Sequence, residues 1–313
     1  MPRHDRSPQD QMQSPKTPRV LYIAGYSRSG STIMDMVLNG HPDVASTGEL
    51  TFLHDDAADT TLTCSCGAIF RDCPVYGDWL ADRPDGEGGV VRRVESRANL
   101  DQLIAGHIAE GDCTVYRDYA LSLFNHLAAK HDAEVIVDSS KSAKDAAGRP
   151  IALARLGGLD VRVLHLTRDP RAVANSYLQS GSNWVLEGRR KPRPLDTLRP
   201  VMGWMLANKI SQRIGQALGP DRYMHVRYED FQRDPATVLG RIGTFADLET
   251  GELGRAVTNG KAFEAGHNVG GNRTRLAPQV VSLSPKPVPR LPMAHSAALR
   301  CVCGRTARKF GYV

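Results

Sequence analysis

The sequence predicts an α/β fold of three layers, in which a mainly parallel central sheet of about five strands lies between helices. The first observation is a set of short apolar runs, typical of fully buried strands, at 20–24, 135–137, 161–167 and 223–226. A shorter strand is expected to end near Thr47. The second observation is helical periodicity between these runs, within 100–130, 171–179 and 201–218. Residues 19–313 are therefore expected to form one domain.

The chain has 313 residues, a net charge of +6 and a pI of about 9.0. A basic protein suits an anionic ligand or a nucleic acid, but charge alone does not decide between them. Residues 1–18 are polar and lack the apolar stretch of a signal peptide, so they are expected to form a disordered tail. No apolar run reaches the ~18 residues of a membrane span, which favours a cytoplasmic protein.

A glycine-rich turn follows the first expected strand and precedes a helix that begins near Ile33. Gly25 and Gly30 have the G-x-x-x-x-G spacing of a P-loop, in which backbone N–H groups at a helix N-terminus face a phosphate. Ser31 takes the place of the P-loop lysine, and the nearby cation is Arg28. The turn therefore suits a phosphate-like anion in a P-loop NTPase-like fold, although it lacks the lysine used on nucleoside triphosphates. The alternative is an ordinary glycine-rich turn.

Polar side chains follow three other expected strands, and ligands collect at the carboxyl ends of strands in open α/β sheets. Glu49 lies just past the second strand, Lys141 follows the third and Arg168 follows the fourth. An arginine is a forked donor for a dianionic phosphate, and Ser176, eight residues further on the next helix, adds a hydroxyl group. The alternatives are a solvated carboxylate for Glu49 and a helix-capping turn around Lys141.

The segment 20–49, with its RSGST turn and its trailing HPDV and GE, resembles the 5′-phosphosulfate loop of PAPS-dependent sulfotransferases. PAPS is 3′-phosphoadenosine 5′-phosphosulfate. The RSGST form is most similar to tyrosylprotein sulfotransferases and the large bacterial sulfotransferase family related to them. The resemblance implies that PAPS is the co-substrate and that its sulfonate passes directly, in line, to an acceptor hydroxyl without a metal. It also implies that the 5′-phosphosulfate is held by Arg28, Ser29, Gly30, Ser31 and Thr32.

Other site residues follow from the same resemblance. Tyrosylprotein sulfotransferases place a catalytic glutamate 21 residues after the loop arginine, which is the spacing from Arg28 to Glu49. A base is required chemically, because the acceptor hydroxyl must lose its proton as sulfur is attacked. Lys141 is implied to contact the transferring sulfonate, and Arg168 with Ser176 to hold the 3′-phosphate.

Two later segments also resemble the family. Tyr228, within a YED segment, is implied to lie near the adenine, although structural packing explains this residue equally well. The loop 267–275 resembles one that closes over PAPS in bacterial relatives, where Arg273 or Arg275 adds a contact to the 3′-phosphate. The alternative for this loop is a turn with a surface arginine. The proline-rich stretch 285–292 departs from the family pattern, which leaves the C-terminal closing element open.

Five of the six cysteines lie in two clusters, one formed by Cys64, Cys66 and Cys73 and the other by Cys301 and Cys303. Together the clusters contain enough thiolates for a zinc site, but C-x-C spacing is less usual for zinc than C-x2-C. Disulfides are rare in a reducing cytosol. Free thiols in a local loop are therefore favoured, and no metal is assigned.

Two stretches, 51–130 and 180–200, are expected to be insertions on the acceptor side. A small molecule, a carbohydrate or a lipid with a hydroxyl group fits as acceptor. A nucleic acid is not expected, because Trp184 is the only aromatic residue among the basic residues of 180–200. Two other functions stay open. A P-loop kinase or NTPase needs a carboxylate such as Asp138 on magnesium, and a non-catalytic nucleotide-binding module has no use for Glu49.

Overall fold

The computed structural model describes residues 17–84, 86–142, 146–180, 199–285, 287–288 and 290–312. The predicted tail lies outside the described residues except for its last two positions, and so does most of the predicted acceptor segment 180–200. Among the residues that are described, no helix combines the length and the apolar character needed to cross a membrane.

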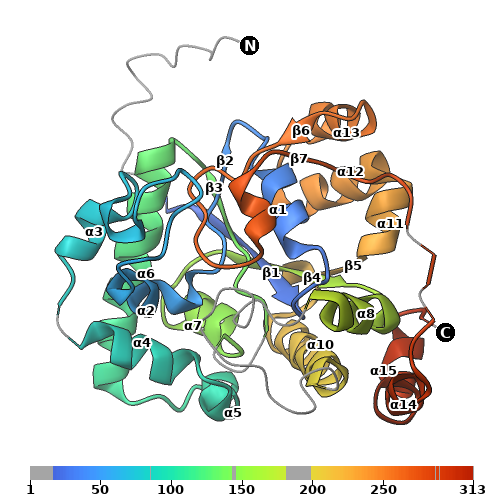
Figure 1. The fold of residues 1–313 in the computed structure, drawn as a ribbon. Helices are drawn as coiled ribbons and strands as arrows, with labels where there is room; N and C mark the ends of the chain where they lie inside the picture. The colour runs from blue at the N-terminus through green and yellow to red at the C-terminus, as the bar shows by residue number, and fades with distance from the viewer. Residues whose placement is uncertain are drawn as a thin grey trace.

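A five-stranded parallel sheet forms the centre of the protein, with the strand order β2-β3-β1-β4-β5 (Figure 1). The strands are β1 (Arg19–Gly25), β2 (Val44–Ser46), β3 (Val135–Asp138), β4 (Val161–Thr167) and β5 (Tyr223–Arg227). Each lies where the sequence pattern predicts a strand, and the predicted parallel α/β fold is confirmed. A separate antiparallel ribbon pairs β6 (Ala262–Phe263) with β7 (Gln279–Val280).

Helices cover both faces of the sheet (Figure 1). The α-helices are α1 (Ser31–Leu38), α2 (Leu53–Ala58), α3 (Gly77–Ala81), α4 (Glu87–Glu95), α5 (Leu100–Ala105), α6 (Glu110–His131), α7 (Arg149–Arg155), α8 (Pro170–Ser180), α10 (Arg199–Leu218), α11 (Tyr228–Arg233), α12 (Pro235–Ala246), α13 (Gly251–Thr258), α14 (Met293–Ala298) and α15 (Gly304–Lys309). The short 3₁₀ turns are η2 (Leu50–Phe52), η3 (Phe70–Asp72), η4 (Arg97–Asn99), η5 (Pro220–Arg222) and η6 (Arg273–Leu276), and η7 (Leu299–Cys303) is a π-helical turn.

Strand β1 has apolar side chains on both of its faces, as expected for a parallel sheet covered on both sides. Val20 and Tyr22 belong to a buried cluster with side chains of α6, α7 and α10. Leu21 and Ile23 belong to a second cluster with side chains of α1, α12 and α13. Buried residues of the segment between β2 and α5, among them Trp79, join the first cluster, so this predicted insertion packs directly on the core of the sheet.

The C-terminal segment packs against α8 and α10 in a third apolar cluster, which includes Trp204, Leu299 and Phe310. The helical segment from Met293 to Lys309 is interrupted, because the π-helical turn η7 separates α14 from α15. Beyond α15, the hydroxyl of Tyr312 lies 2.9 Å from the hydroxyl of Thr167 and donates to Glu229 over 3.0 Å. The chain therefore closes on the carboxyl end of β4.

A fully buried ionic network includes Asp138, the last residue of β3. The guanidinium of Arg149 donates to Asp138 over 2.7 Å and to Glu95, and neither its side chain nor those of its partners are more than 1% exposed. Glu95 also accepts a 2.8 Å hydrogen bond from Tyr116. Buried charges are costly unless they are paired, so removing one member leaves an uncompensated charge in the core. The network therefore holds the end of β3 in a single arrangement.

Asp35, on α1, is a buried carboxyl group that accepts a hydrogen bond from the amide of Asn268. Burial raises its pKa from 3.8 to about 6, although hydrogen bonds from Ser46 and Asn268 oppose the shift. The folded protein thus binds this proton more tightly than the unfolded chain does. Linkage then requires that the contribution of Asp35 to stability falls as the pH rises through this interval.

We expect Asp35→Asn to raise the free energy of unfolding at pH 7.5 by on the order of 2 kcal/mol, because the neutral amide avoids the cost of ionising a buried carboxyl. The gain should shrink as the pH falls toward 3.8 and approach zero below about pH 3, where Asp35 is protonated in both states. Urea unfolding at a series of pH values tests this, with exposed Asp72→Asn as the control. A gain that does not change with pH would contradict the assignment.

Candidate active site

The predicted anion loop connects β1 to α1 and depends on two glycines. Gly25 has a φ of 129°, and a Cβ there would lie 2.3 Å from the carbonyl oxygen of Leu166 on β4. Gly30, the N-cap of α1, has a φ of 92°, and a Cβ there would lie 2.2 Å from the ring of Tyr228. Only glycine fits both the backbone conformation and the space. The loop is thus shaped by contact with β4 and α11 as well as by its own sequence.

The loop has the features of an anion site. The backbone N–H groups of the first turn of α1, beginning at Ser31, have no partners within the helix, and a helix N-terminus favours a negative ligand. The hydroxyl of Ser29 is buried and has no hydrogen-bond partner among the described residues. Arg28 adopts a left-handed φ of 66°, and its guanidinium lies 5.7 Å from the ring centre of Tyr177. A buried hydroxyl without a partner beside an arginine points to a polar ligand.

Arg168, at the end of β4, converges on this loop. Its guanidinium donates to the carbonyl oxygen of Arg28 over 3.1 Å and lies 5.4 Å from the ring centre of Tyr228. Tyr228 begins α11 and is only 7% exposed, and its ring fills the space beside Gly30. The structure therefore brings Arg168, Tyr228 and the loop together, although they are far apart in the sequence.

Helix α8 contributes a second wall to the same site. Ser176 is half-buried on this helix, and the next residue, Tyr177, lies 2.5 Å from the hydroxyl of Ser27 in the loop. Asp169 caps the helix: its carboxylate accepts from the backbone N–H of Arg171 over 2.8 Å and pairs with the Arg171 guanidinium. Tyr177 was not anticipated from the sequence, where its position directly after Ser176 is the only available signal.

Glu49 and Lys141 form an ion pair in which the Lys141 ammonium donates to the carboxylate. The two side chains are 19% and 8% exposed, so Glu49 is not a solvated surface carboxylate. Lys141 has a left-handed φ of 69°, and its backbone N–H donates to Ile23 of β1 over 3.1 Å. The hydroxyl of Tyr22 donates to its carbonyl oxygen. A strained residue with both backbone groups bonded to β1 is held in place, which directs its side chain to Glu49.

The predicted alternative of a helix-capping turn around Lys141 is wrong for the described residues. The next helix described after β3 is α7, which begins at Arg149 with Gly148 as its N-cap. Asp138 is already engaged, because its two oxygens accept from Arg149 and Ser140.

The loop between β6 and β7 contacts both the backbone and the side chain of Glu49. The backbone N–H of Glu49 donates to the carbonyl oxygen of Val269 over 2.8 Å. A Cβ on Gly271 would lie 3.2 Å from Oε1 of Glu49 and 3.6 Å from the hydroxyl of Thr32, so the carboxylate and this hydroxyl face the same residue. The glycines thus allow the loop to approach the carboxylate closely, a constraint that the sequence did not reveal.

Arg275 lies in the same loop but has different contacts. It is 7% exposed and donates to the carbonyl oxygen of Thr63 over 3.2 Å, so the alternative of a surface arginine does not hold for Arg275, whereas it does hold for Arg273, which is exposed. This bond ties it to the segment that precedes Cys64. A contact of Arg275 with a 3′-phosphate stays a prediction.

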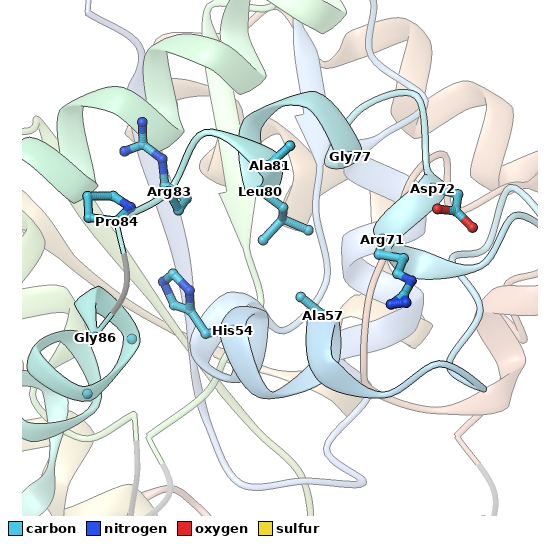
Figure 2. Close-up of a pocket in the computed structure, with 12 residues that line it drawn as sticks. His54, Ala57, Arg71, Asp72, Gly77, Leu80, Ala81, Arg83, Pro84 and Gly86 are labelled. Carbon is cyan, nitrogen blue, oxygen red and sulfur yellow. The ribbon is translucent and has the colours of Figure 1, made fainter.

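A described cavity lies apart from these residues. This cavity has a volume of about 550 Å³ and lies between α2, η3, α3 and the start of α4. Figure 2 shows residues that line it, among them His54, Leu80 and Arg83. It lies within the stretch 51–130 that the sequence predicts as an acceptor-side insertion. None of its lining residues is a predicted site residue, so the site is defined by the strand ends and not by this cavity.

We expect Gly30→Ala to lower the free energy of unfolding by about 2–4 kcal/mol, because alanine is strained at this φ and its methyl group meets the Tyr228 ring. Gly240→Ala is the matched control: Gly240 lies inside α12 with open space around its Cβ position, so this change should raise stability by up to about 1 kcal/mol. Urea unfolding of both variants measures the difference. Equal effects of the two substitutions would refute the close approach at Gly30.

Comparison with solved structures identifies the fold. The sulfotransferase domain from the curacin biosynthetic pathway matches with a TM-score of 0.55 and 18% identity, covering 95% of this chain and 99% of that one. The sulfotransferase domain from the Synechococcus PCC 7002 olefin synthase matches with a TM-score of 0.54 and 21% identity, covering 95% and 96%. At these identities the likeness shows the fold, which agrees with the predicted P-loop-like architecture.

Sequence comparisons identify the family. Mouse (Mus musculus) carbohydrate sulfotransferase 2 is 30% identical over 29% of this chain and 23% of its own length, and the human (Homo sapiens) protein is 28% identical over 31% and 24%. The matched region is thus about a quarter of the length of these relatives. The model of the sulfotransferase family matches residues 19–252, from the start of β1 into α13. Because this match includes the whole central sheet and covers most of the chain, the protein belongs to the sulfotransferase family.

Proposed function

We propose that this protein moves the sulfonate group of PAPS onto an acceptor hydroxyl by direct in-line transfer. The observation that carries the proposal is the ion pair of Glu49 and Lys141 beside the anion loop. A simple phosphate site has no use for a carboxylate, which repels an anion. A carboxylate next to a lysine, by contrast, supplies both a proton acceptor and a charge for sulfonyl transfer.

The proposed binding surface for the donor is formed by the residues that converge on the loop. In this proposal the backbone from Ser29 to Thr32 holds the 5′-phosphosulfate, and the buried Ser29 hydroxyl supplies to it a hydrogen bond that it does not make to any described residue. Arg168 holds the 3′-phosphate with Ser176, since its forked donor lies on the rim of the loop. Tyr228 packs near the adenine.

The transfer step balances without a further reactant. The acceptor oxygen attacks sulfur while its proton passes to Glu49, and the bond between sulfur and the bridging oxygen breaks. The electron pair of that bond stays on the phosphate of 3′-phosphoadenosine 5′-phosphate (PAP), and the acceptor leaves as a sulfate ester. Lys141 and Arg28 stabilise the charge that develops on the sulfonate and the bridging oxygen. Catalysis is then chiefly positioning and electrostatics, as in phosphoryl transfer.

A P-loop kinase or NTPase is disfavoured by two residues. Ser31 stands where that class carries its lysine, and the carboxylate of Asp138 is paired with buried Arg149 instead of being open to magnesium. ATP turnover in the presence of magnesium would distinguish the two functions. A rate that exceeds sulfonate transfer would favour the kinase or NTPase.

The acceptor is proposed only as a class, a hydroxyl compound that is a small molecule, a carbohydrate or a lipid. The partial identity with carbohydrate sulfotransferases supports testing sugars first. Purified protein is incubated with PAPS and a library of hydroxyl compounds, and mass spectrometry detects the added SO₃ group. Calorimetry with PAP tests the donor site independently. Failure of PAP to bind would overturn the proposal.

We expect Glu49→Gln to lower kcat for sulfonate transfer by about two to four orders of magnitude, because the amide cannot accept the acceptor proton. The affinity for PAP should change little, since PAP has no sulfonate. The matched control is Glu252→Gln on the exposed surface of α13, which should leave both quantities unchanged. Initial rates with the acceptor identified by mass spectrometry, together with calorimetry, provide the two measurements. A non-catalytic binding module would instead show no sulfonate transfer with either residue at position 49, and Glu49→Gln would leave its PAP affinity unchanged.

We expect Arg168→Ala to weaken PAP binding by about 10- to 100-fold, because charge-assisted hydrogen bonds to the 3′-phosphate are lost. Adenosine 5′-monophosphate, which lacks that phosphate, should lose far less affinity. Comparing the two nucleotides by calorimetry therefore separates phosphate recognition from general damage to the site. Arg233→Ala, at an exposed position on α11, is the control. An equal loss for both nucleotides would show that Arg168 does not read the 3′-phosphate.

A further inference from the structure

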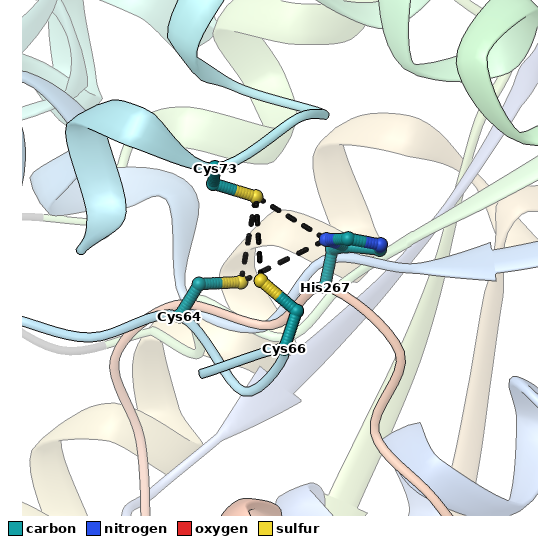
Figure 3. A group of neighbouring side chains, drawn as sticks. All are labelled: Cys64, Cys66, Cys73 and His267. Carbon is teal, nitrogen blue, oxygen red and sulfur yellow. Dashed lines mark hydrogen bonds between the residues drawn. The ribbon is translucent and has the colours of Figure 1, made fainter. Parts of the chain in front are cut away.

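Three cysteines and one histidine come together beside the loop that supports Glu49. Figure 3 shows the side chains of Cys64, Cys66, Cys73 and His267 pointing toward a common centre. Cys73 Sγ lies 3.6 Å from Cys64 Sγ, 3.9 Å from Cys66 Sγ and 3.2 Å from Nδ1 of His267. Cys64 Sγ lies 4.0 Å from the same nitrogen, and all four atoms lie within 4.8 Å of one another.

We propose that these four side chains bind a zinc ion. Zinc–sulfur bonds of about 2.3 Å and zinc–nitrogen bonds of about 2.0 Å in a tetrahedron place neighbouring ligand atoms about 3.5–3.8 Å apart. The separations around Cys73, from 3.2 to 3.9 Å, bracket that range. Three thiolates and an imidazole are one of the ligand sets of structural zinc sites, which are closed and four-coordinate. The ligand set is complete without water, so the ion is structural.

The surroundings match those of a metal site. The carbonyl oxygen of Cys73 accepts from the backbone N–H groups of Tyr76 over 3.1 Å and Gly77 over 2.7 Å, which fixes the backbone of this cysteine. Tyr76 also donates from its hydroxyl to the carbonyl oxygen of His267 over 2.9 Å, so the histidine backbone is fixed from the cysteine side. Ser65, between two of the cysteines, donates to the carbonyl oxygen of Gly266 over 2.7 Å. Hydrogen bonds thus align the two segments before an ion binds.

The other interpretations of the cysteines explain less. A zinc site that joins both cysteine clusters is wrong, because Cys303 is buried in the C-terminal cluster and donates to the carbonyl oxygen of Val201, while the described metal-ligand group includes His267 instead. A disulfide between Cys64 and Cys73 would leave Cys66 and His267 without a role. Free thiols, favoured from the sequence alone, do not account for an imidazole at the same point.

The ion would connect two segments that are about two hundred residues apart in the chain: His267 and Cys73 are separated by 194 positions. His267 lies two residues before Val269, whose N–H donates to Thr47 over 3.1 Å and whose carbonyl oxygen accepts from Glu49. Zinc therefore holds the loop that forms the back of the Glu49 site. This consequence for catalysis rests on the proposed function, whereas the zinc site does not.

Metal analysis of the full chain tests the proposal. We expect about one zinc ion per chain in protein produced with zinc present. Inductively coupled plasma mass spectrometry measures this ratio. Cobalt added to metal-free protein should give the visible bands of tetrahedral cobalt and a strong thiolate-to-metal absorption. Cys66→Ser is the test variant, because Cys66 is exposed and its loss leaves the buried core intact. Cys301→Ser, also exposed, is the matched control.

Cys66→Ser should weaken zinc binding by about 100-fold and lower the Tm, while Cys301→Ser should change neither. Circular dichroism establishes that both variants fold. Zinc far below one ion per chain combined with no cobalt spectrum, a Cys64–Cys73 disulfide in the purified protein, or unchanged zinc affinity in folded Cys66→Ser would each overturn the proposal. PAP binding serves as a separate readout: zinc bound without PAP binding would refute the proposed donor site and leave the metal site standing.

Discussion

The parallel pairing of β1 with β3 on one side and β4 on the other is the constraint on which the candidate site depends. The carboxyl ends of these strands meet at one edge, where the loop after β1, the turn at Lys141 and the side chain of Arg168 come together. The contact of Gly25 with Leu166 shows how tightly this edge is built. A shift of β1 by one residue would turn its side chains to the opposite faces and move the loop away from both neighbours.

At this edge of the sheet, the carboxylates of Asp138 and Glu49 are each paired with a cationic side chain. Asp138 lies at the end of β3, three residues before Lys141, and an unpaired carboxylate there would repel an incoming anion. Its pairing with buried Arg149 removes that repulsion and also fixes the turn. Glu49 is the carboxylate that faces the loop region, and Lys141 balances it. The region therefore retains a cationic character, from Arg28, Lys141 and Arg168, together with one carboxylate, the proposed base Glu49.

The wall behind Glu49 is built from two segments that are distant in sequence. The cysteine-rich segment after β2 and the glycine-rich loop after β6 meet at His267, and the second segment continues directly to Val269 and Gly271 beside Glu49. The proposed zinc site and the proposed base thus share one support. Long loops lose much entropy when they are ordered, and a metal at their junction would offset part of that cost and hold the proposed base in place.

The sequence by itself determined the strands, the glycine turn and the family. Buried parallel strands are continuous apolar runs, and Gly25 and Gly30 lie in a local motif, so short-range patterns are sufficient for them. Motif spacing is also sufficient to predict Glu49, Arg168 and Ser176 as site residues. The tertiary structure alone decided the ion pair of Glu49 with Lys141, the approach of Gly271 and the meeting of His267 with the cysteines. These contacts join residues that are about 90 to 220 positions apart, and no local periodicity encodes such distances.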